Sequence, residues 1–534
     1  MVYLLFSSFL FFHFLLLSFS FSFSSFMLEV DFFSFFSSSI SLVFSFDWIS
    51  FIFSSFVVFI SSIIIIYSGY YMKGDSFFIR FIFILVLFVI SMVFLIFGGN
   101  FFMIMIGWDG LGLVSFCLVI YYSDKDALVS GILTVLMNRV GDGLILLSIF
   151  YFNLMSGFSL DLFFMSGVGC FFLLCSFLTK SAQFPFSSWL PAAMSAPTPI
   201  SSLVHSSTLV TAGIYLSIRF NFIFVGSFCS LLLMILSLLT MILGGFLANF
   251  EMDFKSIVAM STLSQLGLLF FLISIGFVKL AFFHMVSHAF FKSLLFMGTG
   301  GVIINGSQDS RLKGSYLLFS PVLFSVMFVS LFSLLAVPFS VGFYSSDLAL
   351  DFMFCGNLIF FIYLFFLVGC LSTVFYSFRI MFFVFSFVCG KGVLDLNCVS
   401  YFLYFSSLLG IFLTLYWGKF VYTMVLMEDF VLISYPLKMI GVILLFLGLF
   451  SFVGGKVFSF FISLMILFKY FLFKLFFFDY YFKFDQVWIE GFLQTKLNRM
   501  IDFSVYFFDL DFKVLWVSFV SIWFFILFFL STTT

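Results

Sequence analysis

Long apolar runs, each bounded by charged or turn-forming residues, follow one another along most of this 534-residue chain. Runs of this length can cross a bilayer as helices and are too long for the strands of a membrane barrel. The runs cover residues 2–26, 48–69, 77–98, 100–122, 127–152, 162–184, 200–220, 222–249, 255–276, 278–304, 315–337, 343–354 with 357–388, 400–417, 437–454, 457–478 and 514–530. Because every backbone group in hydrocarbon needs an internal partner, the runs predict an all-α polytopic membrane protein with about 15 or 16 transmembrane helices.

The composition supports this assignment and excludes several classes of function. Hydrophobic residues make up 64% of the chain and charged residues only 8%, so a soluble domain could not cover its surface with polar groups. The formal net charge of -1 provides no basic field for a polyanion, which excludes nucleic acid as a partner. The eight cysteines include no C-x-x-C pair and nearly all lie in apolar surroundings, so we expect no disulfide framework, zinc site or iron–sulfur cluster.

Two clusters of helix-breaking residues interrupt the predicted spans. Four of the seven prolines fall within residues 185–199, where no continuous helix can form. A milder break is expected at residues 338–342, although a simple kink is an alternative there. Interrupted membrane helices border protein or water-filled cavities, and in transporters they mark ion sites in matching halves. We therefore expect two discontinuous helices beside an ion pathway.

The distribution of charge divides the chain into five parts. N-terminal helices at 1–99 precede a core at 100–390, which holds both interruptions, and a further helical group at 391–478. The first run is too long and too poor in basic residues for a cleavable signal, so we expect it to be retained as a span. Residues 479–513 are too charged to span, but their helical apolar spacing predicts an amphipathic helix, with a solvated loop as the alternative. The last part, 514–534, holds the final transmembrane helix.

Three ionisable residues, His284, His288 and Lys292, lie at a spacing of four in one apolar run. On a helix this spacing places them on one face over a rise of about 12 Å. A charge in hydrocarbon is costly unless it faces a protein interior or a wet cavity. A single buried histidine is often a satisfied packing residue. Three groups in register favour a proton pathway instead.

Further ionisable residues inside or beside the predicted spans extend this candidate pathway. They are Asp109, Asp142, Lys180, His205 and Asp347. Asp142 has the spacing to pair with Arg139 on one helix, whereas Asp109 is the only charge in its run and needs a partner from elsewhere. Desolvation favours a neutral lysine and a nearby carboxylate favours a charged one, so joining and separating Asp109 and Lys180 would make Lys180 capture and release a proton. His205 follows the proline cluster and titrates near neutrality, which suits proton transfer through water.

Short motifs within and around these residues carry a resemblance to a known family. The motifs occupy residues 107–116, 138–142, 179–185, 189–199 and 284–292. Together they resemble the chain 5 family of respiratory complex I, the largest antiporter-like subunits of NADH:ubiquinone oxidoreductase. The resemblance covers roughly residues 45–380 strongly, and the charged segment before the last span is similar to the family's lateral helix. It implies antiporter-like inverted repeats in the core and a mitochondrially encoded, multi-pass protein of the mitochondrial inner membrane.

The resemblance implies roles for the first half of the candidate pathway. Asp109 matches the family's motif acid, usually a glutamate, which pairs with the lysine matched by Lys180. The shorter aspartate changes the reach of that pair. Asp142 matches a further channel acid, and His205 matches a bridging histidine.

The second half of the pathway contains the main departure from the family. Lys292 matches the central lysine, with His284 and His288 as relay partners on its helix. The family typically has a lysine directly before the aspartate that Asp347 matches, whereas this chain has Ser346. Either Asp347 carries the terminal step with water, or the outlet of the pathway is altered.

The resemblance also implies a function and partners. It implies a core membrane-arm subunit of the proton-translocating NADH:ubiquinone reductase, in which NADH, FMN, iron–sulfur clusters and ubiquinone belong to other subunits. The expected partners are the adjacent antiporter-like chain 4, supernumerary subunits and phospholipids such as cardiolipin. A subunit of a stand-alone sodium–proton antiporter shares the core motifs and is the main alternative. A passive channel would need a more continuous polar pore, and a purely structural scaffold would leave pumping unchanged when Lys180 is replaced.

Overall fold

The computed structural model describes most of the chain up to residue 453 and nothing beyond it. The described residues are 2–22, 25–35, 38–156, 167–224, 227–304, 321–355, 360–385, 405–412, 414–415, 418–419 and 438–453. The described residues all belong to one compact unit, Met1–Phe458. The amphipathic helix predicted at 479–513 and the final span predicted within 514–534 therefore lie outside the described residues, as does the span predicted at 457–478.

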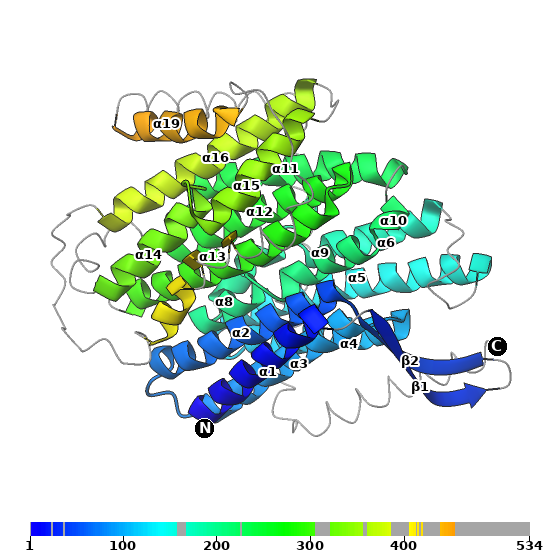
Figure 1. The fold of residues 1–534 in the computed structure, drawn as a ribbon. Coiled ribbons are helices and arrows are strands. Elements are labelled where there is room, and N and C mark those ends of the chain that lie inside the picture. The colour runs from blue at the N-terminus through cyan, green and yellow to red at the C-terminus, as the bar shows by residue number, and fades with distance from the viewer. Residues whose placement is uncertain are drawn as a thin grey trace. The chain divides into compact units, whose positions relative to one another are not determined.

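Helices dominate the described part of the chain, which confirms the predicted helical membrane protein (Figure 1). Nine helices in this part are long and apolar enough to cross a membrane. The longer helices are α1 (Val2–Ser22), α2 (Trp48–Tyr71), α3 (Phe78–Phe97), α4 (Phe101–Val119), α5 (Lys125–Ser156), α6 (Gly167–Lys180), α11 (Phe228–Phe250), α12 (Phe254–Ile275), α13 (Val278–Ile304), α14 (Pro321–Leu334), α15 (Val341–Cys355), α16 (Phe360–Phe385) and α19 (Ile440–Val453). Shorter pieces are α7 (Trp189–Ala192), η1 (Ala193–Ser195), α8 (Thr198–Val204), α9 (Leu209–Arg219) and α10 (Asn221–Phe224).

An antiparallel hairpin that the sequence analysis did not predict lies between α1 and α2. Its strands are β1 (Phe26–Phe35) and β2 (Ser38–Phe46). In β1 the acidic residues Glu29 and Asp31 alternate with apolar residues, a period of two that a search for long apolar runs does not detect. The Gly99 N–H donates to the Val43 carbonyl at 2.7 Å, which attaches β2 to the turn between α3 and α4.

The first predicted interruption is present and extends further than expected. After α6 ends at Lys180, the chain runs through α7 and η1 before α8 begins at Thr198. The predicted continuous span at 200–220 is wrong, because the helix stops again at Val204 and resumes at Leu209. In this second break the Ser206 hydroxyl donates to the Ser202 carbonyl, and the Thr208 hydroxyl donates at 2.9 Å to the Leu203 carbonyl, which also accepts from the Ser207 N–H. Hydroxyl groups thus satisfy carbonyls that a continuous helix would have paired.

The second predicted interruption separates α14 from α15. Helix α14 ends at Leu334 and α15 begins at Val341. Ala336 and Phe339 in the connection have φ angles of 57° and 69°, in the left-handed region that no helix interior adopts. Both sites of helix breaking are therefore confirmed, and the inverted symmetry of the two halves stays a prediction.

Helix α13 lies at the centre of the bundle and contacts both α8 and α9, the helices on the two sides of the break at residues 204–209. Figure 1 shows it among α8, α9, α12 and α15, and its residues from Leu280 to Val302 are buried. Gly300 allows close approach here, since a Cβ atom would lie 2.1 Å from the Tyr67 hydroxyl and 2.6 Å from that of Thr198. Any polar group on α13 must therefore find its partners inside the protein.

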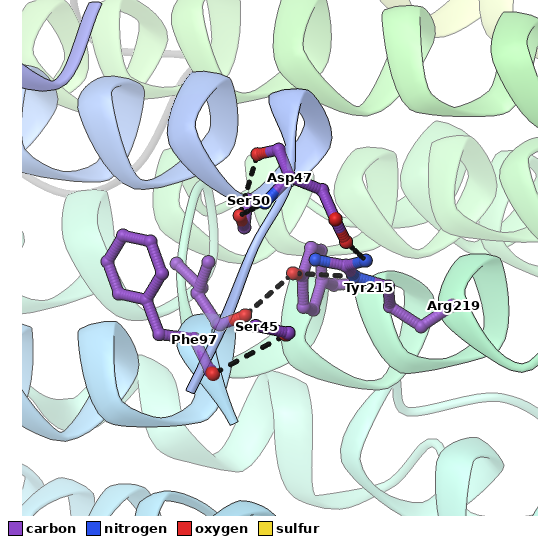
Figure 2. Close-up of polar contacts among 7 residues, drawn as sticks. Ser45, Asp47, Ser50, Phe97, Tyr215 and Arg219 are labelled. Carbon is purple, nitrogen blue, oxygen red and sulfur yellow. Dashed lines mark hydrogen bonds and ion pairs between the residues drawn. The ribbon is translucent and has the colours of Figure 1, made fainter. Parts of the chain in front are cut away.

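A polar cluster fixes one end of the bundle where α2, α3 and α9 meet (Figure 2). The Arg219 guanidinium pairs with the Asp47 carboxylate and donates through Nε to the Tyr215 hydroxyl at 3.0 Å. Tyr215 donates in turn to the Ile96 carbonyl at 2.7 Å. At the start of α2 the Asp47 N–H donates to the Ser50 hydroxyl at 2.8 Å. Asp47 therefore takes part both in the start of α2, through its main chain, and in holding the end of α9, through its carboxylate.

Replacement of Asp47 by alanine is expected to lower the free energy of unfolding by about 3 kcal/mol, because it leaves the largely buried Arg219 without a countercharge. Thermal unfolding can be followed by dye labelling of the buried thiols of Cys170 and Cys229. Asp31→Ala, at an exposed carboxylate on β1, is the control and should change stability by about 0.5 kcal/mol or less. Equal labelling midpoints for the two variants would contradict this role of Asp47.

Candidate functional site

Lys180, the last residue of α6, is fully buried beside Trp108 of α4. Its ammonium group donates to the Trp108 carbonyl at 3.0 Å and lies 4.7 Å from the centre of the Trp108 ring. Gly112, one turn further along α4, also faces the amine, since a Cβ atom there would lie 3.5 Å from Lys180 Nζ. The lysine is therefore held by a neutral carbonyl and an aromatic face.

The two predicted carboxylates, Asp109 and Asp142, both lie beside Arg139, and Asp142 also contacts Trp108. The indole N–H of Trp108 donates to Asp142 Oδ1 at 2.8 Å, and Arg139 donates to Asp142 Oδ2 at 3.1 Å. The Arg139 guanidinium lies 3.9 Å from Asp109, whose Oδ1 atom is buried without a hydrogen-bond partner in the described part of the chain.

In the structure, Asp109 and Lys180 do not form the predicted direct ion pair. Among the described residues, no carboxylate oxygen lies within ion-pair distance of Lys180, and Trp108 stands between the amine and Asp142. The sequence analysis placed Trp108 in the same motif but gave it no role. The position of Trp108 directly before Asp109 could have indicated that it takes part in the site.

His205 occupies the break between α8 and α9 and is buried. Its ring centre lies 6.4 Å from that of Trp189 and 6.5 Å from that of Phe296 on α13. His205 Nδ1 has no hydrogen-bond partner among the described residues. An unpaired buried nitrogen is a place for a proton or a water molecule to bind.

His288 on α13 faces the same break. The main chain of Ser206 lies beside its ring, but outside normal hydrogen-bond geometry, and both ring nitrogens are unpaired in the part of the chain that the structure describes. The residue is fully buried. The structure therefore brings His288 to the broken helix that carries His205, as a relay requires.

His284, one turn before His288, is the best-connected residue of the column. One ring nitrogen lies 2.9 Å from the Ser345 hydroxyl on α15, and the other lies 3.1 Å from Gln265 Oε1 on α12. Ser287 also lies 3.2 Å from Ser345. Gln265 and Ser345 were missed in the sequence because neither ionises.

Lys292, at the other end of the column, is fully buried and donates to the Ser261 hydroxyl of α12 at 2.5 Å. Like Lys180, it meets a neutral oxygen acceptor. A proton on either amine is therefore not held by a fixed countercharge in direct contact. Such an amine can exchange its proton with neighbouring groups at a smaller cost than an ion-paired one.

A cavity of about 80 Å³ joins the column to α15 and α19. Gln265, His284, Ser346 and Asp347 provide polar groups to its wall, which is otherwise mostly apolar. This volume has room for several water molecules. The structure therefore brings Asp347 to the same cavity as His284, while Ser346 donates to the Gly342 carbonyl at 2.8 Å.

The fold and the site define a class: a helical membrane domain with interrupted helices and a buried line of lysines and histidines, as in antiporter-type proton translocators. A family profile described as "NADH:quinone oxidoreductase/Mrp antiporter, TM" matches residues 98–372, and one described as "NADH-Ubiquinone oxidoreductase (complex I), chain 5 N-terminus" matches residues 32–82. The chain belongs to the NADH-ubiquinone oxidoreductase chain 5 family.

Individual relatives agree with this assignment. The chain is 39% identical over 430 residues to chain 5 of Locusta migratoria. The aligned region covers 77% of this chain and 72% of the relative. It is 47% identical over 300 residues to chain 5 of Anopheles gambiae, which covers 53% of this chain and 50% of the relative. The match thus spans about half the length of the mosquito protein.

Two solved structures share the fold. The Mrp complex from Dietzia sp. DQ12-45-1b aligns with a TM-score of 0.70 at 22% identity, covering 83% of this chain and 52% of that one. The archaeal membrane-bound sulfane sulfur reductase aligns with a TM-score of 0.62 at 18% identity, covering 71% of this chain and 81% of that one. At these identities the likeness concerns the fold alone.

Proposed function

We propose that this chain translocates protons as a membrane-arm subunit of the mitochondrial NADH:ubiquinone oxidoreductase. The observation that carries the proposal is the pair of fully buried lysines, Lys180 and Lys292, each hydrogen-bonded to a neutral oxygen. His205 and His288 lie at the broken helix, and His284 extends the line toward the cavity of Asp347. The chain's membership of the chain 5 family identifies the enzyme complex in which we place this proton translocation.

In this mechanism protons move by local transfers between fixed groups. Lys180 holds a proton against the Trp108 carbonyl and releases it when the charge distribution at Asp109 and Asp142 changes. His205 and His288, with unpaired ring nitrogens, accept and pass protons through water at the break. Lys292 stores the next proton, and the path continues through His284 to the cavity of Asp347.

The proposal assigns the redox chemistry to other subunits. NADH, FMN, iron–sulfur clusters and ubiquinone would be bound there, and this chain would use energy that reaches it through the adjacent chain 4. Supernumerary subunits and phospholipids such as cardiolipin would complete its surroundings in the mitochondrial inner membrane.

Replacement of Lys180 by methionine tests the proposal. The number of protons translocated per NADH oxidised, measured in sealed vesicles with the assembled complex, is expected to fall, because methionine fills the same space without a proton-carrying group. Lys73→Met, at an exposed lysine in the turn after α2, is the matched control and should leave the ratio unchanged. An unchanged proton-to-NADH ratio in Lys180→Met would contradict the proposed relay and would favour a purely structural role for this chain.

A sodium–proton antiporter is the second candidate, favoured by the profile that also covers Mrp antiporters. It predicts that an imposed sodium gradient drives proton movement in vesicles when NADH is absent. The proposed function predicts no such flux, and an otherwise identical potassium gradient provides the control.

A further inference from the structure

The outlet end of the pathway carries two carboxylates and no basic residue on its own helix. Asp347 and Asp351 lie one turn apart on α15, and residues 341–355 contain no lysine, arginine or histidine. Asp351 is buried and Asp347 is half-buried, so their negative charges repel one another in a poorly solvated place. Two such carboxylates are stabilised either by a shared proton or by a cation from another element.

Helix α19 packs directly against this acidic face. A Cβ atom at Gly441 would lie 2.9 Å from Asp347 Oδ1 and 3.6 Å from Leu350 Cδ1, so the main chain of α19 comes close to the Asp347 carboxylate at this residue. At its other end α19 is fixed on α16, since a Cβ atom at Gly448 would lie 2.2 Å from Val374 Cγ1. Gly441 and Leu444 also line the cavity that contains His284 and Asp347.

Lys438 lies three residues before Gly441, about one helical turn away. It is exposed, and it is a cation on the described part of the chain whose charge acts on both Asp347 and Asp351. The contact between α15 and the start of α19 therefore holds one cation and two carboxylates beside the cavity that His284 lines.

We propose that Lys438 replaces in space the basic residue that this chain lacks at position 346 and forms the outlet of the pathway with Asp347 and Asp351. The inference rests on the proposed proton-translocating function and adds a residue to it. Lys438 acts as a positioning residue: its ammonium group offsets the repulsion between the two carboxylates. Asp347 can then accept a proton from cavity water and pass it to water at the exposed rim, with no net bond made or lost.

The test uses the assembled complex in sealed vesicles and the ratio of protons translocated to NADH oxidised. Lys438→Met is expected to lower this ratio to that of Lys180→Met, and Lys438→Gln, which keeps a polar side chain but no charge, should do the same. Lys438→Arg should retain the ratio. Adding Ser346→Lys to Lys438→Met should restore it, because a lysine returns to the same carboxylates.

Lys419→Met is the matched control. Lys419 is also exposed and follows Gly418, which packs against Val341 at the start of α15. The ratio of protons translocated to NADH oxidised in Lys419→Met should equal that of the unmodified chain. The ratio is normalised to the amount of intact complex, so a loss of assembly does not count as a loss of pumping.

The outcomes separate the two proposals. A normal ratio in Lys438→Met beside a reduced ratio in Lys180→Met overturns the role of Lys438 and leaves the relay standing. A reduced ratio that Ser346→Lys does not restore also overturns the replacement of position 346. Normal ratios in both lysine variants overturn the proposed function itself.

Discussion

Replacing Lys292 by methionine is expected to stop proton translocation through this chain while the complex still oxidises NADH. Lys292 is fully buried and its amine donates to Ser261 at 2.5 Å, so it is the proton-carrying group between α12 and the histidine column. Methionine has nearly the same length and needs no hydrogen-bond partner, so packing on α13 is kept. The measurement is the proton-to-NADH ratio in sealed vesicles.

Ser261→Ala is the control for Lys292→Met. It removes the acceptor but keeps the amine, so it should reduce the ratio much less than the lysine variant does. If Lys292→Met pumped as many protons per NADH as the unmodified chain, the column on α13 would have only a structural role.

Gly342→Ala is expected to prevent stable assembly of the chain. A Cβ atom at this position would lie 1.8 Å from the Ser333 carbonyl oxygen, and a main-chain atom cannot move aside as a flexible side chain does. The connection between α14 and α15 would have to open, which also displaces Ser345 from His284. We expect the amount of intact complex to fall by about tenfold or more, equivalent to at least about 1.4 kcal/mol.

Gly143→Ala provides a matched helical control. Nothing lies within 4 Å of a Cβ atom at Gly143, which is exposed on α5. Alanine should be neutral or slightly stabilising there because it favours the helix. Native gel electrophoresis of the two variants gives the comparison, and comparable amounts of complex in both would show that the α14–α15 connection tolerates a side chain.

The sequence predicted those features that local spacing determines. His284, His288 and Lys292 share one helix face because four residues make about one turn, and the structure places all three in the protein interior. The proline cluster likewise predicted the first interruption, since proline removes a helix donor wherever it stands.

What remained hidden depends on contacts between distant segments. Trp108 lies between Lys180 and Asp142 only because α4, α5 and α6 pack together, and no spacing within α4 reveals this. The break at His205 contains serines and a threonine rather than proline, so no helix-breaking residue in the sequence predicts it. Lys438 was also missed, since it lies more than 90 residues from Asp347 in the sequence.

The ion pair of Arg219 with Asp47 ties the short helix α9 to the start of α2. This helix has 11 residues, which makes it about 16 Å long, with the clamped arginine at one end and the break that holds His205 beyond the other. Residues 209–218 of α9 are all buried, and the helix packs on α6, α12 and α13. An ion pair at one end and a break lined by hydroxyl groups at the other therefore set the two ends of one packed segment, so the position of the histidine gap is tied to the start of α2.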